Sequence, residues 1–319
     1  MSSTLEIFIA SLLLAASGVL LAATKVRGSA VLLHHGTHGR LYRNRTLNRW
    51  AAEAVGIIAL AIGFDEYRRI HGLHHGYNTF AQPEGDEEAA GLLADGLRPG
   101  RSLQDLKRNL MVTLISPAWH ARQAWARLKA NFFAGPPLRR LAAWGFWGGI
   151  GTWAAMGGWM TGFFGAVALL LTAGSVGSYL ELTSRHIWNV TPDSQGRERQ
   201  LELSHWRLPT PSVPDRWTPG STLRFIGSVA VKALWRIAVT PVDLTHHAAH
   251  HLAWDAGPQQ DRPPAWTDAA QAYSDRLRAA PNLHKHVFGS LSEPLNASFE
   301  ALAKAPPLKP GAAPASTPR

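Results

Sequence analysis

The sequence predicts an all-α protein: an integral membrane helical protein with a cytoplasmic helical cap. Two observations predict this architecture. Long apolar runs without charge are followed by basic segments, as in proteins that cross a bilayer. Histidines gather in three clusters at spacings of three and four residues, which bring side chains to one face of a helix.

The composition limits what the chain can bind. Its 319 residues include no cysteine, so disulfides, thiolate zinc sites and iron–sulfur clusters are excluded, and any metal is held by His, Asp or Glu. The net charge of +10 is compatible with nucleic-acid binding, but it accompanies 13 tryptophans and long uncharged runs. Basic loops beside apolar spans are typical of the cytoplasmic side of membrane proteins, so we predict a membrane partner and no nucleic acid.

Two apolar runs are long enough to cross a bilayer. The first, Ile7–Ala23, has no charge and is followed by Lys25 and Arg27. A cleaved signal peptide would carry its basic region before the apolar run, so we favour a retained span. The second run lies between Arg140 and Glu181, where no charged residue occurs, and it is long enough for two crossings.

The second run predicts a hairpin of two helices, over residues 142–158 and 161–180, that enters and leaves the membrane on one side. The glycine pair at 157–158 supplies the turn. Two weaker apolar stretches, Ala54–Phe64 and Phe225–Val239, predict helices that lie in the membrane interface. A buried helix of a soluble core is the alternative for each.

Flanking charges predict the side that the histidine clusters face. Residues 25–49 hold basic side chains and no acidic one, which places them in the cytoplasm by the positive-inside rule. If Ala54–Phe64 does not cross, the hairpin returns the chain to that side, and all three clusters lie on the cytoplasmic face of a membrane of the bacterial inner type. We predict one domain over residues 1–304 and a disordered Pro- and Ala-rich tail over residues 305–319.

The three histidine clusters carry the chemistry. They read His34-His35-Gly36-Thr37-His38, His71-Gly72-Leu73-His74-His75 and His246-His247-Ala248-Ala249-His250-His251. Neutral imidazole suits iron, copper, zinc and nickel, whereas calcium and magnesium prefer oxygen. Isolated histidines are more often structural, and we interpret four of them so: His120, His205, His284 and His286.

Eight ligands are too many for one ion, so the clusters predict two ions that share them, each with an open position. Zinc hydrolysis fits less well, since catalytic zinc usually takes three protein ligands and a water. The predicted ligands are His34, His38, His71, His74, His75, His247, His250 and His251. The choice between His34 and His35, and between His246 and His247, stays open.

The pattern HxxxH, HxxHH, HxxHH resembles that of the membrane fatty acid desaturase family. The similarity extends to residues 43–50 after the first cluster, to Tyr67-Arg68-Arg69 before the second, and to Asn78-Thr79 and Pro83-Glu84 after it. It covers residues 30–90 well and residues 180–255 more loosely.

The resemblance implies a non-haem site of two iron ions, with O₂ as co-substrate and an acyl lipid, acyl-CoA or acyl-carrier substrate that gains a C=C double bond. It implies a further ligand after the last membrane helix, where this chain has His186. No catalytic residue beyond the metal ligands is predicted. The sequence shows no flavin or haem module, so a separate electron donor such as a ferredoxin or a cytochrome b5-like protein is implied, and the basic surface would dock it.

Acidic residues near the clusters are candidates to orient the ligand imidazoles by accepting their second N–H. The candidates are Asp65, Glu66, Glu84 and Asp243. Solvated charge is the commoner role for such residues, so none is assigned to the site.

Two other functions compete with desaturation. A hydroxylase or ketolase acting on a lipid or carotenoid would use the same di-iron site, although the 32 residues between His38 and His71 resemble the desaturase spacing. A membrane metal-handling protein is the non-enzyme alternative. Transporters place ionisable ligands inside their spans, and neither predicted membrane run contains a histidine.

Overall fold

The computed structural model describes residues 17–18, 26, 28–76, 79–82, 84–188, 203–204, 206–207, 213–239, 287–288, 290 and 292–308. They fold mainly into helices, which confirms the all-α prediction. The exception is a pair of two-residue strands, in which β1 (Trp206–Arg207) runs parallel to β2 (Val287–Phe288). The third histidine cluster lies outside the described residues, as does the first predicted span, Ile7–Ala23, apart from residues 17–18.

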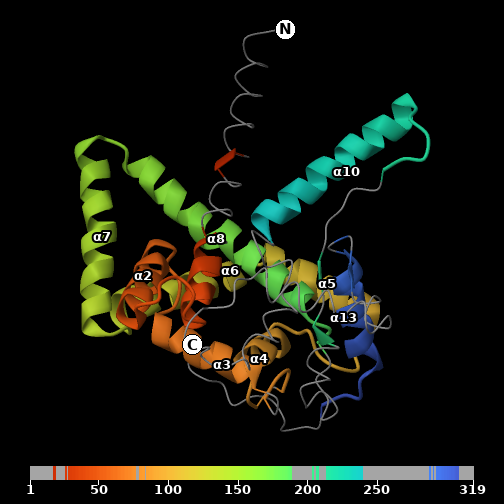
Figure 1. The fold of residues 1–319 in the computed structure, drawn as a ribbon, viewed down its shortest axis with the longest axis horizontal. Coiled ribbons are helices and arrows are strands. Elements are labelled where there is room, and N and C mark those ends of the chain that lie inside the picture. The colour runs from red at the N-terminus through yellow and green to blue at the C-terminus, as the bar shows by residue number, and fades with distance from the viewer. Residues whose placement is uncertain are drawn as a thin grey trace.

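Short helices form the body of the molecule, at the open end of a hairpin of two longer helices (Figure 1). Residues 28–37 are helical and are followed by α2 (Arg45–Ile58), α3 (Phe64–His75), α4 (Glu87–Ala94), α5 (Leu103–Ile115), α6 (Pro117–Leu128), the π-helical η1 (Lys129–Phe133) and, much later, α13 (Ser292–Lys304). Several of these helices begin at a residue whose side chain accepts a backbone N–H of the first turn. These caps are Asn44, Asp86, Ser102 and Ser116.

The two helices of the predicted hairpin are confirmed as α7 (Pro137–Met156) and α8 (Met160–Arg185), whereas their crossing of a membrane stays a prediction. The turn lies at the glycine pair, and Gly158 has φ +72°, a conformation that a residue without a Cβ adopts freely. Among the described residues, α8 is the helix that is both long and apolar enough to cross a membrane. The Gly- and Trp-rich α7 does not meet that standard, so length and composition support one crossing helix.

The stretch Ala54–Phe64 is not one helix, and that prediction was wrong. Helix α2 ends at Ile58, Leu60 takes φ +51°, and α3 begins at Phe64. The carbonyl of Ala61 in the intervening turn accepts hydrogen bonds from Asn131 Nδ2 at 2.9 Å and from Arg139 Nη2 at 2.6 Å. Polar groups from η1 and α7 therefore satisfy the backbone where the helix breaks.

The stretch Phe225–Val239 is helical, as predicted, and lies within α10 (Pro219–Ala238) apart from Val239. In Figure 1, α10 projects from the body on the same side as the α7–α8 turn. Its first turn carries a capping box, in which Thr218 and Ser221 exchange side-chain and backbone hydrogen bonds. This helix is therefore locally encoded and does not depend on a partner for its start.

Two apolar clusters support the region where the histidines meet. The larger joins α4, α5, α13 and the end of α8, and its fully buried members include Phe80, Trp188 and Phe299. The smaller consists of Leu33, Ala52 and Phe64. Ala305 is also buried and Leu308 packs on the larger cluster, so ordered packing extends four residues beyond the predicted boundary at 304.

Candidate metal centre

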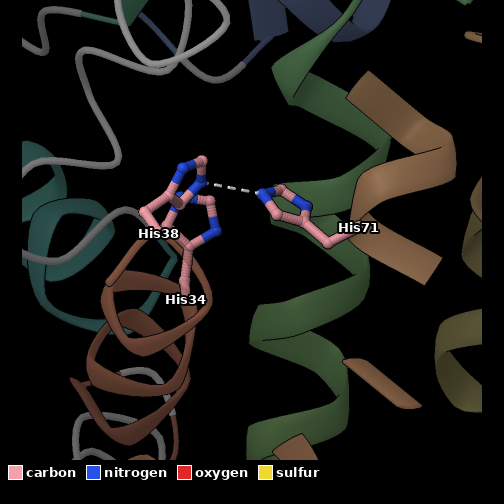
Figure 2. Close-up of side chains that lie close together, drawn as sticks. All are labelled: His34, His38 and His71. Carbon is pink, nitrogen blue, oxygen red and sulfur yellow. Dashed lines mark hydrogen bonds between the residues drawn. The ribbon is translucent and has the colours of Figure 1, made fainter. Parts of the chain in front are cut away.

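Four imidazoles from two segments converge at one place. His34 and His38 come from the end of the helix at 28–37, whereas His71 and His75 lie one turn apart on α3. His71 Nε2 is 3.1 Å from His38 Nε2 and 3.0 Å from His75 Nε2. The ring centroids of His34 and His71 are 4.5 Å apart. Figure 2 shows His34 and His38 facing His71 from the opposite segment.

A second group of imidazoles lies beside the first. His74 Nε2 is 2.9 Å from Nε2 of His186, which is 112 residues away in the chain and directly follows α8. The rings of His71 and His74 are 6.1 Å apart between centroids, so the two groups are neighbours. The end of the long helix α8 therefore delivers His186 to the histidines of α3.

A close crossing of two helices places the first cluster. A Cβ on Gly36 would lie 2.4 Å from the Cβ of Ala52 on α2, so only glycine fits between these segments. Asn48 Nδ2 donates to the Gly36 carbonyl at 2.7 Å, and Asn48 Oδ1 accepts from the backbone N–H of Leu41 at 2.9 Å. The glycine inside the cluster and Asn48 thus set where His34 and His38 lie.

Hydrogen-bond partners outside the cluster fix the orientation of His74 and His186. His74 Nδ1 lies 2.9 Å from Asp86 Oδ2, and both side chains are fully buried. A carboxylate accepts hydrogen bonds, so His74 carries its proton on Nδ1 and presents the Nε2 lone pair to His186. Glu88 Oε2 is also 3.3 Å from His74 Nδ1, and His186 Nδ1 is 3.1 Å from Ser204 Oγ.

Burial favours the neutral form of three of these imidazoles, His38, His71 and His74. Desolvation lowers the pKa of His38 to about 3, with Arg40 and His35 adding repulsion. Burial also lowers the pKa of His71 and, against the opposing effect of Asp86, that of His74. Neutral imidazole is the form that binds a metal ion, because the ring nitrogen then has a free lone pair.

The donor set fits a metal. Two imidazole nitrogens that bind one ion at about 2.1 Å and at right angles lie about 3.0 Å apart. The separations His71–His38, His71–His75 and His74–His186 are 3.1, 3.0 and 2.9 Å. The ligand atoms of His34, His38 and His71 lie within 4.8 Å of one another, a grouping that could hold a metal ion.

All of the predicted ligands that lie among the described residues come together here. They are His34, His38, His71, His74, His75 and His186. His247, His250 and His251 lie outside the described residues, as do His205, His284 and His286. His34 is buried and faces His71, whereas His35 is half-buried, which favours His34 in the first cluster.

The isolated His120 has a structural role, as the sequence indicated. Its Nε2 lies 2.8 Å from the carbonyl of Leu114, near the end of α5. Its ring packs against Trp119. This histidine belongs to the α5–α6 connection and not to the cluster.

Sequence reasoning missed the residues that contact the cluster from outside. Asp65 and Glu66 are exposed and pair with Arg49 and Arg69, whereas the buried Asp86 holds His74. Asp86 also caps α4, so the start signal of that helix was the available clue. Tyr67 belongs to the stretch Tyr67-Arg68-Arg69 that resembles the family, although no role was predicted for it, and Ser204 gave no signal. Tyr67 stacks on His71 at 13°, and its hydroxyl lies 3.4 Å from His34 Nδ1.

A solvent-open cavity of about 180 Å³ lies between α4, α6 and α8. Glu88 lines it and also approaches His74. The wall includes the charged side chains of Glu87, Asp95 and Arg127, which a bound acyl chain would have to desolvate.

Comparison with known proteins places the chain in a family. A family model described as fatty acid desaturase matches residues 10–254, which include all three histidine clusters, the hairpin and His186. No curated protein and no solved structure matches the chain. The match spans well over half of the 319 residues and agrees with the converging histidines, so the chain belongs to the fatty acid desaturase family.

Proposed function

We propose that the protein is an O₂-dependent di-iron desaturase that introduces a C=C double bond into a membrane acyl lipid, acyl-CoA or acyl-carrier substrate. The observation that carries the proposal is the two adjacent groups of imidazoles, one around His71 and one at His74 and His186. Membership of a family of di-iron oxidoreductases supports the same chemistry.

The residues that would hold the metal are His34, His38, His71, His74, His75 and His186, together with the third-cluster residues His247, His250 and His251. When bound, a pair of iron ions supplies the oxidising power that removal of hydrogen from an unactivated methylene requires. The protein contributes neutral ligands, fixed ring orientations and exclusion of water. Asp86 and Ser204 orient the rings of His74 and His186, and burial keeps solvent from His71.

The overall reaction balances only with an electron donor. Two hydrogens leave adjacent carbons, and with two electrons and two protons they reduce O₂ to two waters. Arg43 lies just before α2, Arg45 is the first residue of α2, and Arg68 lies on α3. All three are exposed and would attract an acidic carrier such as a ferredoxin or a cytochrome b5-like protein.

Exposed apolar side chains support a position in the membrane. Helix α7 exposes Leu141, Trp144 and Trp153 by 70%, 53% and 62%. Exposed Trp125 and Phe133 come before α7, and Arg140 lies in its first turn. Aromatic and basic residues gather in this way at the boundary between lipid and headgroups. We therefore place α7 and α8 in the bilayer and the histidines on the cytoplasmic side, which the basic residues before Arg49 favour.

Lipid analysis of cells that express the chain tests the proposal. Wild type and His120→Ala, which changes a histidine outside the cluster, should bind iron and give a new double bond. His71→Ala should lose both, since His71 contacts His34, His38 and His75.

The products also separate the competing functions. A new hydroxyl or ketone in place of the double bond would mean that the protein is a hydroxylase or ketolase that uses the same site. Full iron occupancy in His71→Ala, or a purified wild type that holds iron but consumes no O₂ with any reductant and lipid, would contradict the enzyme assignment.

A further inference from the structure

His186 lies on a short extended segment that other parts of the chain hold from both sides. It directly follows α8 and has φ −132° and ψ 157°. On one side it forms an antiparallel bridge with Ser204, and the backbone N–H of Ile187 donates to the carbonyl of Leu203 at 2.7 Å. The last carbonyls of an α-helix have no partner inside the helix, so the path of the chain after α8 depends on such outside contacts.

The other side of this segment meets a single buried hydroxyl. Ser298 Oγ, on α13, donates to the carbonyl of His186 and accepts from the backbone N–H of Trp188 at 3.4 Å. Ser298 is 1% exposed. A hydroxyl carries a donor and two acceptor lone pairs on one atom, so it can satisfy both backbone groups at once. Alanine at this position would leave a carbonyl and an N–H unpaired in the core.

Helix α13 is docked on the body by close contacts. It packs on α5 and on the end of α8 (Figure 1). Phe299 and Leu302 are each 2% exposed and belong to the larger apolar cluster. The backbone N–H of Gly100 donates to the Leu302 carbonyl at 2.9 Å, and a Cβ on Gly100 would lie 2.6 Å from Cγ of Pro307. The connection between α4 and α5 therefore holds the helix that carries Ser298.

Trp188 extends the same contact to the imidazoles. Its ring centroid lies 5.4 Å from that of His186 and 6.1 Å from that of His74. Its Nε1 donates to the carbonyl of Leu182 at 2.9 Å, which fixes the ring. One hydroxyl on α13 thus holds the backbone of a candidate ligand and of the residue that packs beside two candidate ligands.

We propose that Ser298 is a positioning residue of the metal centre, which holds the backbone of His186 so that its Nε2 faces Nε2 of His74. The ring of His186 is held separately, by Ser204 Oγ at 3.1 Å from Nδ1. Contacts of this kind around a ligand set its orientation toward the metal. Helix α13 lies beyond the end of the family match, so the family pattern does not include this contact. The inference rests on the proposed di-iron centre.

Cobalt binding to the full-length protein, purified metal-free in detergent, tests this role. Wild type should bind two cobalt ions, each with its own visible absorption. His186→Ala, which removes a ligand, identifies the absorption of the ion that His186 holds. In Ser298→Ala, that ion should bind about 10-fold more weakly, and the affinity for the other ion should stay unchanged.

An isosteric pair of variants isolates the hydroxyl. Ser298→Thr and Ser298→Val add the same bulk, and only threonine keeps the O–H. Threonine should therefore bind the ion at His186 more tightly than valine. If the two variants bind it equally, the hydroxyl does not position His186.

Two further variants separate positioning from stability. Ser292→Ala removes an exposed hydroxyl from the same helix and should change the affinity for neither ion. Leu302→Ala leaves a cavity one turn further along α13. It should lower the melting temperature of the metal-free protein without a selective loss of one ion.

Other outcomes overturn the proposal. Equal weakening of both ions in Ser298→Ala, failure of that variant to fold, or the same selective loss in Leu302→Ala would mean that Ser298 stabilises the fold and has no particular role at His186. Unchanged cobalt binding in Ser298→Ala would mean that the other contacts of His186 suffice. A wild type that binds no cobalt would overturn the proposed metal centre itself, and the role of Ser298 with it.

Discussion

A single carboxylate, Asp86, connects two functions at the residue scale. Its Oδ1 accepts the backbone N–H of Glu88 at 3.0 Å and caps α4, while its Oδ2 accepts from His74 and from the N–H of Ala81. In Asp86→Asn the amide can keep the cap, but an NH₂ group then faces two donors. We expect metal affinity to fall about 10–100-fold with the fold retained.

Metal titration measures the affinity, and circular dichroism checks that the fold is retained. Asp65→Asn is the matched control, because Asp65 is exposed and pairs with Arg49 outside the cluster. Metal affinity should stay at the wild-type value in the control. Equal losses in both variants would contradict a specific role for Asp86.

Tyr67 makes two separable contacts with the cluster. Its ring stacks on His71 with centroids 5.5 Å apart, and its hydroxyl lies 3.4 Å from His34 Nδ1. Tyr67→Phe keeps the stack and removes the hydroxyl, so the change in metal affinity should be smaller than in Tyr67→Leu, which removes both. Spectroscopic titration with cobalt measures the metal affinity of both variants. If Phe is as damaging as Leu, the hydroxyl and not the ring positions the ligands.

At the element scale, a buried ion pair anchors the hairpin to the body. Arg139 at the start of α7 donates to Glu53 on α2 at 2.7 Å and to Asn131 at 2.7 Å, and its side chain is 1% exposed. Arg139→Met should leave Glu53 without its cation and lower the free energy of unfolding by about 3–5 kcal/mol. Adding Glu53→Leu should recover part of the loss.

Thermal unfolding in detergent measures this loss as a lower melting temperature. Arg140→Met is the control, because Arg140 makes only a 3.4 Å contact with the Phe133 carbonyl and is partly exposed. A melting temperature for Arg139→Met no lower than that of the control would show that the ion pair does not anchor α7.

Helices and turns were predictable from the sequence where nearby residues determine them, and not where a contact with a distant residue does. The hairpin turn at Gly157 and Gly158 and the facing histidines of α3 follow from spacing and from residues within a few positions. The break of Ala54–Phe64 does not, because Arg139 and Asn131 create it from far along the chain. Asp86 was missed for the same reason, since its contact with His74 depends on how α4 packs on α3.

At the scale of the whole molecule, the proposed topology places the α7–α8 turn and the metal centre on opposite sides of the membrane. Met156 at the turn is 84% exposed, and Arg68 on α3 is also exposed. Because the chain has no cysteine, Met156→Cys and Arg68→Cys each carry one reactive thiol. In intact cells, a maleimide that cannot cross membranes should label position 156 and not position 68. Position 68 should react only after the cells are permeabilised. Labelling of 68 alone would invert the topology, and labelling of both before permeabilisation would mean that α7 and α8 do not separate two compartments.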